Sequence, residues 1–443
     1  MTNLAPSTIV KRRLLIVTYY WPPSGGSGVQ RWLKFCKYLA PLGWEITVLT
    51  PENPSFALRD ESLVADVPDS IEVLKLPIWE PYQVYLKIGS FFGIRASQPT
   101  DFIKTGRKSL FASVSGWVRG NLFIPDARIC WVRPAVQFLQ SWLPSGDPPI
   151  VITTGPPHSM HLIGLHLKKL NPAIKWVADF RDPWSEWDVL DTLSLTAWAR
   201  ARHRNLERQV LTQADRVITI APFHRDRLEA LGNRSVDVMT NGFDPDDFRA
   251  ITRKRTTRFT VRHVGMVDEL RDPRPFMIIL KQLMAELPDF ARDVFVEFIG
   301  NVNTAFRQEV EEDTALASVT RFTRSLPHQQ LVQTYGETDV QLLVLAHTAL
   351  APGNLPGKFF EYLASGNPIL AIGPASGDAQ AVLAETNAGQ IFERSDLIGI
   401  KSALMGYYRL WKAGHSAPAG RVSQYARPVL AARLHQLLLS MFS

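Results

Sequence analysis

The stretch RLLIVTYYWPPSGGSGVQRWLKFCKYLAPLG, residues 13–43, contains a complete strand, turn and helix pattern. Residues 13–20 form a short and mostly apolar run, which is typical of a strand buried on both faces of a parallel sheet. Glycines follow, and apolar residues then recur at the spacing of one helical face: Val29, Trp32, Leu33, Cys36, Leu39 and Ala40. Gly43 marks the end of this helix. The stretch therefore predicts the first strand–helix unit of an α/β fold.

The same alternation of apolar strands and helical patterns continues through most of the chain. The apolar runs form two series: 45–50, 150–154, 175–180 and 216–221 in the first, and 259–266, 294–300, 339–346 and 368–373 in the second. Strands that alternate with helices form parallel sheets with right-handed crossovers. The sequence thus predicts an α/β protein with two Rossmann-like, doubly wound domains.

The length of 443 residues also suits two domains of about 100–200 residues each. We expect residues 1–240 to form the first domain and residues 258–422 the second. The polar stretch 241–257, NGFDPDDF followed by a basic TRKRTTR run, is interpreted as the linker. An amphipathic helix at 423–443 has no third domain to join, so we expect it to dock back on the first domain. The region 78–122 receives no assignment of elements.

Cysteine content and hydropathy bear on the compartment. The chain has only two cysteines, Cys36 and Cys130, so at most one disulfide can form, which favours a reducing, cytoplasmic location. The basic residues before the first apolar run resemble a signal peptide, but PPSGG follows in place of a small-residue cleavage site. No apolar stretch reaches the roughly 18 residues that cross a bilayer.

Basic and aromatic residues are concentrated in the window 81–142. The chain has a net charge of +7, and this window alone contains eight basic residues, two acidic residues and nine of the Phe and Trp residues. Such a composition suits an anionic membrane surface at the inner face of the plasma membrane, or a phosphate-rich acceptor. An ordinary solvated face over a tryptophan-rich core remains an equal alternative. Nucleic acid is not expected as a partner, because no nucleic-acid-binding motif is visible.

The first chemical motif is the loop WPPSGGSGVQR at 21–31, between a predicted strand and a predicted helix. Gly25, Gly26 and Gly28 allow the backbone to turn sharply and approach a ligand closely. The free N–H groups and the dipole of the following helix favour an anion there. The loop lacks the G-x-G-x-x-G dinucleotide pattern, so a structural turn remains an open alternative.

The second motif is APGNLPGKFFEYLASGNPILAIGP at 351–374. Pro356 suits the first turn of a helix, which places Lys358 near the helix N-terminus, where its ammonium and the dipole act together on an anion. Glu361 follows one turn later, and its carboxylate can accept hydrogen bonds from a ribose diol. A capped helix with a surface Lys–Glu pair is the alternative.

The third motif is FTVRHVGMVDELRDPRPF at 259–276. The predicted strand ends at Gly265, and Arg271 and Arg274 precede a predicted helix. Two guanidinium groups near a helix start can bind a diphosphate bidentately. Alternatively, they are solvated charges that lie near the acidic residues of the same loop.

These elements, in this order, resemble the retaining glycosyltransferases of the GT-B fold, family four. More narrowly, the chain is similar to bacterial surface-polysaccharide members that carry a WPP-x-GG-x-G-x-x-R loop, a T-x-PP motif, a D-F-R-D-P-W motif and a PGK-x-x-EYLA-x-G-x-P motif. The corresponding segments are 21–31, 154–159, 179–184 and 356–368. The resemblance covers the chain from about residue 13 and implies two domains that face a cleft, with the acceptor on the first domain and a nucleotide-sugar on the second.

The resemblance also implies roles for individual residues. The glycine-rich first loop would touch the donor diphosphate and the reacting sugar, Arg271 and Lys358 would meet the diphosphate, and Glu361 would hold the ribose. Glu361 matches the second glutamate of a paired-glutamate motif, whereas Gly353 stands where the first glutamate is expected. The donor sugar is therefore left open.

Arg31, His158 and Asp182 are the candidate catalytic residues. In the related fold, Arg31 and His158 fall in loops that face the cleft, and His158 would contact the sugar or the acceptor. A loop histidine with a structural hydrogen bond is the alternative. Asp179, Arg181 and Asp182 follow a predicted strand at its carboxyl end, where α/β ligands gather, and an internal Asp–Arg ion pair is an equal interpretation.

No metal site and no cofactor are predicted. The pair Asp244 and Asp246 matches a D-x-D metal motif, but it lies in the expected linker, where an Asx-type turn explains it better. No His/Cys/Glu cluster has metal-ligand spacing.

The sequence therefore predicts a metal-independent, retaining glycosyltransferase that moves a hexosyl or N-acetylhexosaminyl group. We expect its donor to be a UDP-sugar and its acceptor a polysaccharide or lipid-linked glycan. The alternatives are a nucleotide-sugar 2-epimerase of the same fold and a non-catalytic partner subunit.

Overall fold

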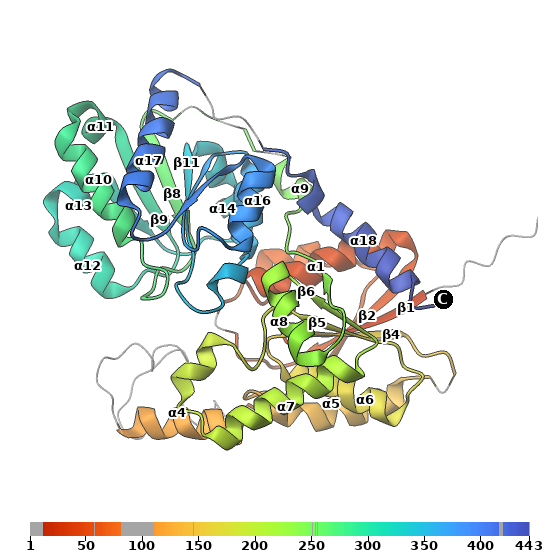
Figure 1. The fold of residues 1–443 in the computed structure, drawn as a ribbon. Coiled ribbons are helices and arrows are strands. Elements are labelled where there is room, and N and C mark those ends of the chain that lie inside the picture. The colour runs from red at the N-terminus through yellow and green to blue at the C-terminus, as the bar shows by residue number, and fades with distance from the viewer. Residues whose placement is uncertain are drawn as a thin grey trace, which may run out of the picture. The chain divides into compact units, whose positions relative to one another are not determined.

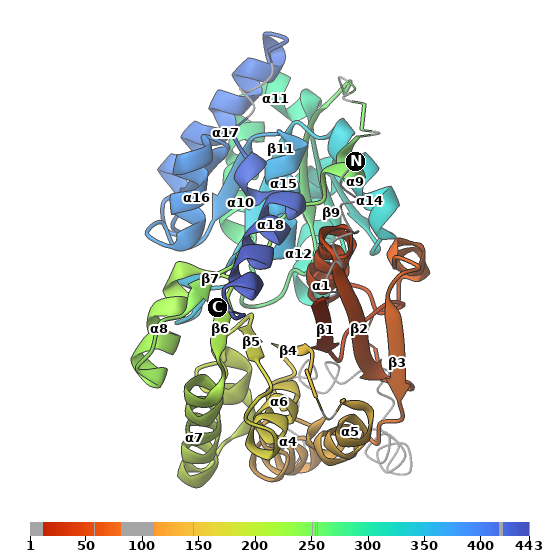
Figure 2. The same ribbon diagram turned by 90° about the vertical axis from the view of Figure 1, so that its right-hand side faces the viewer.

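The computed structural model describes residues 12–56, 58–80, 110–144, 146–249, 251–252, 254, 256–415 and 420–442. The chain forms two compact units, which we call unit 1 (Met1–Met239 with Ala431–Ser443) and unit 2 (Thr240–Leu430). Each unit contains one parallel sheet with helices on both faces (Figures 1 and 2). The predicted pair of doubly wound α/β domains is therefore confirmed.

Unit 1 has a seven-stranded sheet in the order β3-β2-β1-β4-β5-β6-β7. Its strands are β1 Arg12–Val17, β2 Trp44–Pro51, β3 Glu72–Leu76, β4 Ile150–Gly155, β5 Trp176–Phe180, β6 Arg216–Thr219 and β7 Asp237–Val238. From β1 the chain steps outward through β2 to β3, and from β4 it steps the other way to β7. Because right-handed crossovers place helices on opposite faces for opposite directions, the sheet is doubly wound.

The helices of unit 1 follow this pattern. They are α1 Ser27–Leu39, α4 Leu110–Leu122, α5 Ile129–Trp142, α6 Ser159–Leu170, α7 Ala197–Gln213 and α8 Pro222–Gly232, with short 3-10 turns at Ala40–Leu42, Glu61–Asp66 and Asp188–Leu193. Helices α5, α6 and α7 lie on one face of the sheet, and α1 lies on the other (Figure 1). Gly43 ends the first helical segment with a left-handed φ of 87°, as its position in the sequence predicts.

Unit 2 has a six-stranded sheet in the order β10-β9-β8-β11-β12-β13. Its strands are β8 Phe259–Val264, β9 Val294–Ile299, β10 Thr320–Thr323, β11 Val340–Val344, β12 Ile369–Ile372 and β13 Gly389–Phe392. The direction of winding reverses between β8 and β11, just as it does between β1 and β4 in unit 1. Each unit thus has one topological switch point at the carboxyl edge of its sheet.

The helices of unit 2 pack on both faces of this sheet. They are α9 Pro245–Phe248, α10 Arg274–Glu286, α11 Pro288–Asp293, α12 Thr304–Glu312, α13 Thr314–Val319, α14 His328–Thr334, α15 Gly357–Ser365, α16 Asp378–Thr386 and α17 Leu397–Lys412, with 3-10 turns at Tyr335–Glu337, Ala351–Gly353 and Ser423–Tyr425. Buried residues of α10, α12, α13 and α17 pack on β8 and β9 in one hydrophobic core.

The segment that follows β7 and the last helix lie at the boundary of the two units. Unit 2 begins at Thr240, so the polar stretch 241–257 belongs to it, and the side chain of Asn241 donates to the carbonyl of Leu355. Helix α18, Arg427–Leu439, crosses the boundary, because residues from Ala431 onward belong to unit 1. There His435 accepts a 2.9 Å hydrogen bond from the indole of Trp44.

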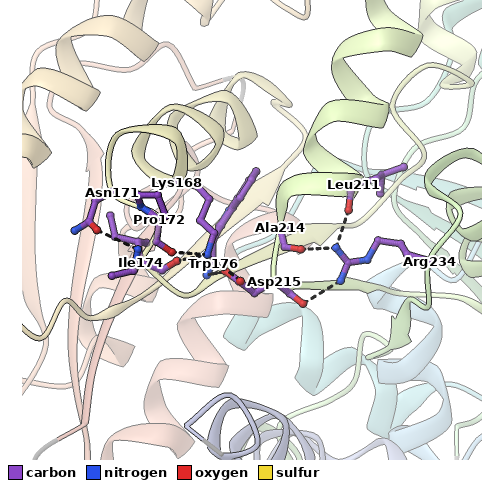
Figure 3. A network of polar contacts seen from close by, with 10 residues as sticks. Lys168, Asn171, Pro172, Ile174, Trp176, Leu211, Ala214, Asp215 and Arg234 are labelled. Carbon is purple, nitrogen blue, oxygen red and sulfur yellow. Dashed lines mark hydrogen bonds and ion pairs between the residues drawn. The ribbon is translucent and has the colours of Figure 1, made fainter.

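A polar network stabilises the amino edge of the sheet in unit 1 (Figure 3). The ammonium of Lys168, near the end of α6, lies 2.8 Å from the carboxylate of Asp215, which also accepts from the backbone N–H of Trp176 at the start of β5. Arg234 donates to three carbonyls around the end of α7. This network lies at the end of the strands opposite to the switch point.

Candidate functional site

The residues that the sequence singles out gather at the two switch points. In unit 1 the loop with Gly25, Gly26 and Gly28 follows β1, and His158 follows β4. In unit 2 Gly265 and Arg271 follow β8, and α15 with Lys358 and Glu361 follows β11. Ligands of open α/β sheets bind in this position, outside the carboxyl ends of the strands where the order reverses.

Two glycines shape the switch point of unit 2. Gly265 has a φ of 113° and Gly300 a φ of 136°, a region that favours glycine. A Cβ at Gly300 would collide with the carbonyl of Gly265, so the ends of β8 and β9 approach this closely only because residue 300 lacks a side chain. A Cβ at Gly265 would lie 3.1 Å from Nζ of Lys358, which shows that the lysine ammonium lies directly against this strand end.

Lys358 is the cation at the centre of this edge. Its ammonium donates a 2.7 Å hydrogen bond to the carbonyl of Val264 and is half-buried. Burial, together with the nearby positive charge of Arg271, lowers the pKa of Lys358 to about 7. Since an ammonium has three donors, two remain for other partners. Helix α15 starts one residue earlier with no side-chain cap, which leaves N–H groups of its first turn without an intrahelical partner.

Arg271 and Arg274 are placed differently. Arg271 lies in the loop after β8, where its Nη1 is 2.7 Å from Asp268, and 34% of its side chain is exposed. Arg274 pairs with both Glu309, at 2.8 Å, and Asp272, at 3.1 Å. The predicted pair of guanidinium groups is therefore split, with Arg271 beside Lys358 and Arg274 held between two carboxylates.

Glu361 lies one turn into α15, and both of its carboxylate oxygens have partners. Oε2 accepts a 2.8 Å hydrogen bond from the hydroxyl of Tyr335, and Oε1 lies 3.2 Å from Nε2 of His328. Burial raises the pKa of Glu361, but His328 and Tyr335 outweigh it and lower the pKa below its usual value. The carboxylate is thus ionised and fixed in orientation. Gly353, where a first glutamate is expected, lies buried in the 3-10 turn before α15.

In unit 1 the first glycine loop is shaped around Arg181. Gly26 precedes α1 with a φ of 97°, and α1 has no side-chain cap. A Cβ at Gly28 would collide with Nη1 of Arg181, so the guanidinium lies against the first turn of α1. Arg181 also donates through Nε to the carbonyl of Gly155, at 3.2 Å, and through Nη2 to that of Pro156. This contact between Arg181 and Gly28 is not visible in the sequence, because 153 positions separate the two residues.

Arg31 has a structural position. Its side chain is fully buried, and its Nε and Nη2 lie 3.1 and 2.9 Å from the two carboxylate oxygens of Asp179. Asp179 also accepts from the Trp32 indole at 2.8 Å and from the Thr154 hydroxyl at 2.9 Å. The internal Asp–Arg ion pair considered for Asp179 is therefore present, with Arg31 as the partner. A fully buried guanidinium acts on a ligand only through the loops that it positions.

His158 lies in the loop that follows β4, directly before α6. Its ring is 2% exposed and stacks on Trp184, with ring centroids 5.3 Å apart. Neither ring nitrogen has a hydrogen-bond partner among the residues that the structure describes. Burial, with His161, Arg181 and His203 nearby, lowers the pKa of His158 well below its usual value, so the ring is neutral. Asp182 is half-buried beside Arg181 and makes no hydrogen bond to a described residue.

The predicted Asx-type turn is present at Asp244. Its carboxylate accepts a 3.1 Å hydrogen bond from the backbone N–H of Asp246 and caps α9. Within the described ranges, no group of three His, Cys, Asp or Glu side chains is arranged to hold a metal ion.

Much of the basic, aromatic window 81–142 lies outside the described residues, which resume at residue 110. In the part that is described, Trp117 and Leu122 of α4 are 44% and 64% exposed. The neighbouring α7 begins with Trp198, which is 66% exposed, and Asn121 links the two helices by accepting from the backbone N–H of Thr196. No helix in the described part of the chain combines the length and hydropathy needed to cross a bilayer.

Comparison with known families follows the same division of the chain. The model of the Glycosyl transferase 4-like domain matches residues 25–242. The match covers 218 of the 443 residues. The matched segment holds the switch point of unit 1, from the first glycine loop to the last strand of the sheet. No curated protein matches the sequence.

Solved structures extend the likeness to both units of the chain. It is similar to sucrose-phosphate synthase from Thermosynechococcus elongatus, with a TM-score of 0.62 and 13% identity over 97% of this chain and 99% of that one. It is also similar to an α,α-trehalose-phosphate synthase (UDP-forming) from Burkholderia xenovorans, in complex with glucose-6-phosphate. The TM-score is 0.61 and the identity 11%, over 96% of this chain and 100% of that one. For the lipopolysaccharide outer core galactosyltransferase WaaB, the TM-score is 0.56 and the identity 11%, over 97% of this chain and 99% of that one. The chain therefore has the GT-B glycosyltransferase fold.

Proposed function

We propose that this protein is a retaining, metal-independent glycosyltransferase that moves a hexosyl or N-acetylhexosaminyl group from a UDP-sugar to a hydroxyl of a polysaccharide or lipid-linked glycan. The observation that carries the proposal is the arrangement of Lys358, Arg271 and the start of α15 at the switch point of unit 2. The glycosyl transferase 4-like domain and the GT-B fold support it. The choice of UDP is supported by the UDP-forming synthase with a similar fold.

In this proposal unit 2 binds the donor. Negative charge builds on the diphosphate as the glycosidic bond breaks, and Lys358, Arg271 and the free N–H groups of α15 stabilise that charge. Glu361 accepts hydrogen bonds from the ribose hydroxyls, in an orientation fixed by Tyr335 and His328. Because these cations neutralise the leaving group, the reaction needs no metal ion.

Unit 1 is assigned the acceptor and the reacting sugar. The loop with Gly25, Gly26 and Gly28 presents backbone N–H groups at the start of α1. Asp182 has a carboxylate without a hydrogen bond to a described residue and is a candidate acceptor-binding group. His158 is neutral and its ring nitrogens have no hydrogen-bond partner among the described residues, so it is a candidate to exchange a hydrogen bond with a sugar hydroxyl. Arg31 acts as a positioning residue through Asp179.

A cytoplasmic location, peripheral to the inner face of the plasma membrane, fits a lipid-linked acceptor. The exposed Trp117, Leu122 and Trp198 provide an apolar surface on unit 1 that suits contact with an anionic membrane.

Gly353 favours a second candidate, a non-catalytic partner subunit that kept the fold and lost full donor binding. Such a subunit would release no diphosphate with any donor and acceptor. A 2-epimerase would convert the donor without an acceptor.

The test starts with a thermal-shift screen of nucleotides and nucleotide-sugars. Release of nucleoside diphosphate is then measured with the best donor and membrane lipid extracts, with and without EDTA. We expect acceptor-dependent release that EDTA leaves intact. A strict requirement for a divalent ion, or release without any acceptor, would contradict the proposal.

A further inference from the structure

Three arginines line a cavity at the edge of unit 2, away from its switch point. The cavity has a volume of about 440 Å³, which lies in the range of small-molecule sites, roughly 300–1,000 Å³. Arg258 directly precedes β8, Arg321 lies in the edge strand β10, and Arg307 lies on α12. Glu311 is the one acidic residue among the described residues that line it. The lining therefore has an excess of positive charge.

Aromatic rings hold the three guanidinium groups in place. Arg258 and Arg321 both lie over the ring of Phe295, with Cζ 5.3 and 5.1 Å from its centroid. Arg307 lies over Phe322 at 5.5 Å. Contact with a ring restricts an arginine without using its N–H donors, so these cations are positioned while their donors stay available.

The polar groups of the cavity have few partners. Among described residues, Arg321 makes no hydrogen bond or ion pair, and Nε of Arg258 and the hydroxyl of Thr320 are buried without a partner. Arg258 donates through Nη2 to the carbonyl of Val294. Of the three arginines, only Arg307 forms an ion pair with a carboxylate in the described part of the chain, that of Glu311 at 2.7 Å. Donors therefore outnumber acceptors around this space.

The electrostatic environment of Arg258 also indicates an excess of positive charge in the cavity. Burial, with the positive charge of Arg321 nearby, lowers the pKa of Arg258. Asp293 is the acid that offsets this effect, but its carboxylate is already bound to Tyr408 and Lys412, at 2.9 and 2.7 Å. An anion between Arg258 and Arg321 would remove their repulsion and satisfy the free donors.

This cavity is separate from the proposed donor site. Strand β8 runs from Phe259 to Val264, with Arg258 before it and Gly265 after it. Six residues of extended strand span about 20 Å, so Arg258 lies at the amino edge of the sheet and Lys358 at the carboxyl edge. Arg321 lies in the outer strand β10, which β9 separates from β8.

We propose that the cavity of Arg258, Arg307 and Arg321 is a second anion site, which binds a compact polyanion such as the diphosphate or phosphate-ester group of a small molecule. Guanidinium groups match phosphate oxygens bidentately, and three of them converge here. The inference stands without the proposed function, because it involves other residues at the other edge of the sheet.

The test is calorimetric titration of the full chain with inorganic pyrophosphate at constant ionic strength, in the Lys358→Ala background so that the donor site is weakened. We expect one remaining binding event, which Arg321→Ala weakens about tenfold, the effect of one hydrogen bond to a charged group. Arg307→Ala should weaken it similarly. Arg409→Ala is the matched control, because Arg409 is an exposed arginine of α17 outside the cavity, and it should change nothing.

Two results would overturn the inference. One is a complete loss of pyrophosphate binding in Lys358→Ala itself. The other is equal affinity in the Arg321→Ala, Arg307→Ala and Arg409→Ala chains, which is the behaviour of ordinary solvated arginines. Both substituted cavity residues lie at the surface, and a circular dichroism spectrum checks that each variant is folded.

Discussion

The two switch points carry the same kinds of residue but use them differently. In unit 1, Arg31 is fully buried and its Nε and Nη2 donate to Asp179, which also accepts from Trp32 and Thr154. In unit 2, the ammonium of Lys358 meets one backbone carbonyl and lies half-exposed beside glycine. A cation that the protein neutralises shapes the chain around it, whereas one with spare donors at a strand edge can bind a ligand.

The largest effect is expected where the charge is fully enclosed. Asp179→Ala leaves Arg31 buried without a counter-charge, and we expect unit 1 to lose about 3–5 kcal/mol of unfolding free energy. Tryptophan fluorescence during urea unfolding measures this, because eleven of the twelve tryptophans precede residue 200. Thr154→Val, which removes one hydrogen bond to the same carboxylate, should cost about 1 kcal/mol. Equal, small losses in both variants would mean that the ion pair contributes no more to the stability of unit 1 than a single hydrogen bond does.

The second effect depends on pH and belongs to unit 2. The pKa of Lys358 falls from 10.5 in the unfolded chain to about 7 in the folded one, so between these values the unfolded chain binds the extra proton. The unfolding free energy of the free protein should therefore rise with pH over this window. Affinity for UDP should change in the opposite direction, by up to about tenfold per pH unit above 7, because the ligand needs the charged ammonium.

Calorimetric titrations with UDP at pH 7, 8 and 9 measure this slope. In Lys358→Met the slope should disappear, while Arg409→Ala keeps it. A wild-type affinity that is constant from pH 7 to 9 would refute the role given to the ammonium.

The third effect tests the close packing of strand end and lysine. Gly265→Ala places a methyl group at a φ of 113° and 3.1 Å from Nζ of Lys358. We expect a loss of about 1–3 kcal/mol in stability from the backbone and weaker UDP binding from the displaced ammonium. Gly406→Ala, in the middle of α17 with open space around its Cα, is a control that should not weaken binding. UDP affinity equal to that of the wild type in Gly265→Ala would show that this glycine does not contribute to the UDP site.

The smallest effect concerns the orientation of Glu361. Tyr335→Phe removes the 2.8 Å hydrogen bond to Oε2 but keeps the ring, so we expect UDP affinity to fall by about 1 kcal/mol. The pyrophosphate affinity of the same variant should be unchanged, because Tyr335 bonds Glu361, the carboxylate proposed to hold the ribose. A loss with both ligands would show a general disturbance of unit 2.

The sequence predicts the central strands of both sheets well and the outer strands poorly. The predicted runs 150–154 and 294–300 match β4 Ile150–Gly155 and β9 Val294–Ile299, which are largely buried. The four strands without a prediction are β3, β7, β10 and β13, which are the outermost strands of the two sheets. An outer strand is short and partly exposed, as the pattern of β3 shows, and so lacks a continuous apolar run.

For the candidate site, the sequence locates the loops and helix starts but not the partners of their side chains. The glycines and Lys358 are recognisable because strand–glycine–helix order is local. The pairing of Arg31 with Asp179 spans 148 positions, and that of Tyr335 with Glu361 joins different helical segments. Both pairings depend on which strands become neighbours in the sheet, and local sequence patterns do not determine that order.

The most direct test of the central claim compares UDP with uridine in calorimetric titrations of the wild-type chain and Lys358→Ala. If Lys358 meets the diphosphate, the wild type binds UDP far more tightly than uridine, and the substitution removes most of that difference while uridine affinity stays the same. If the ratio of the two affinities is unchanged in Lys358→Ala, the diphosphate does not bind at this strand end, and the account is wrong.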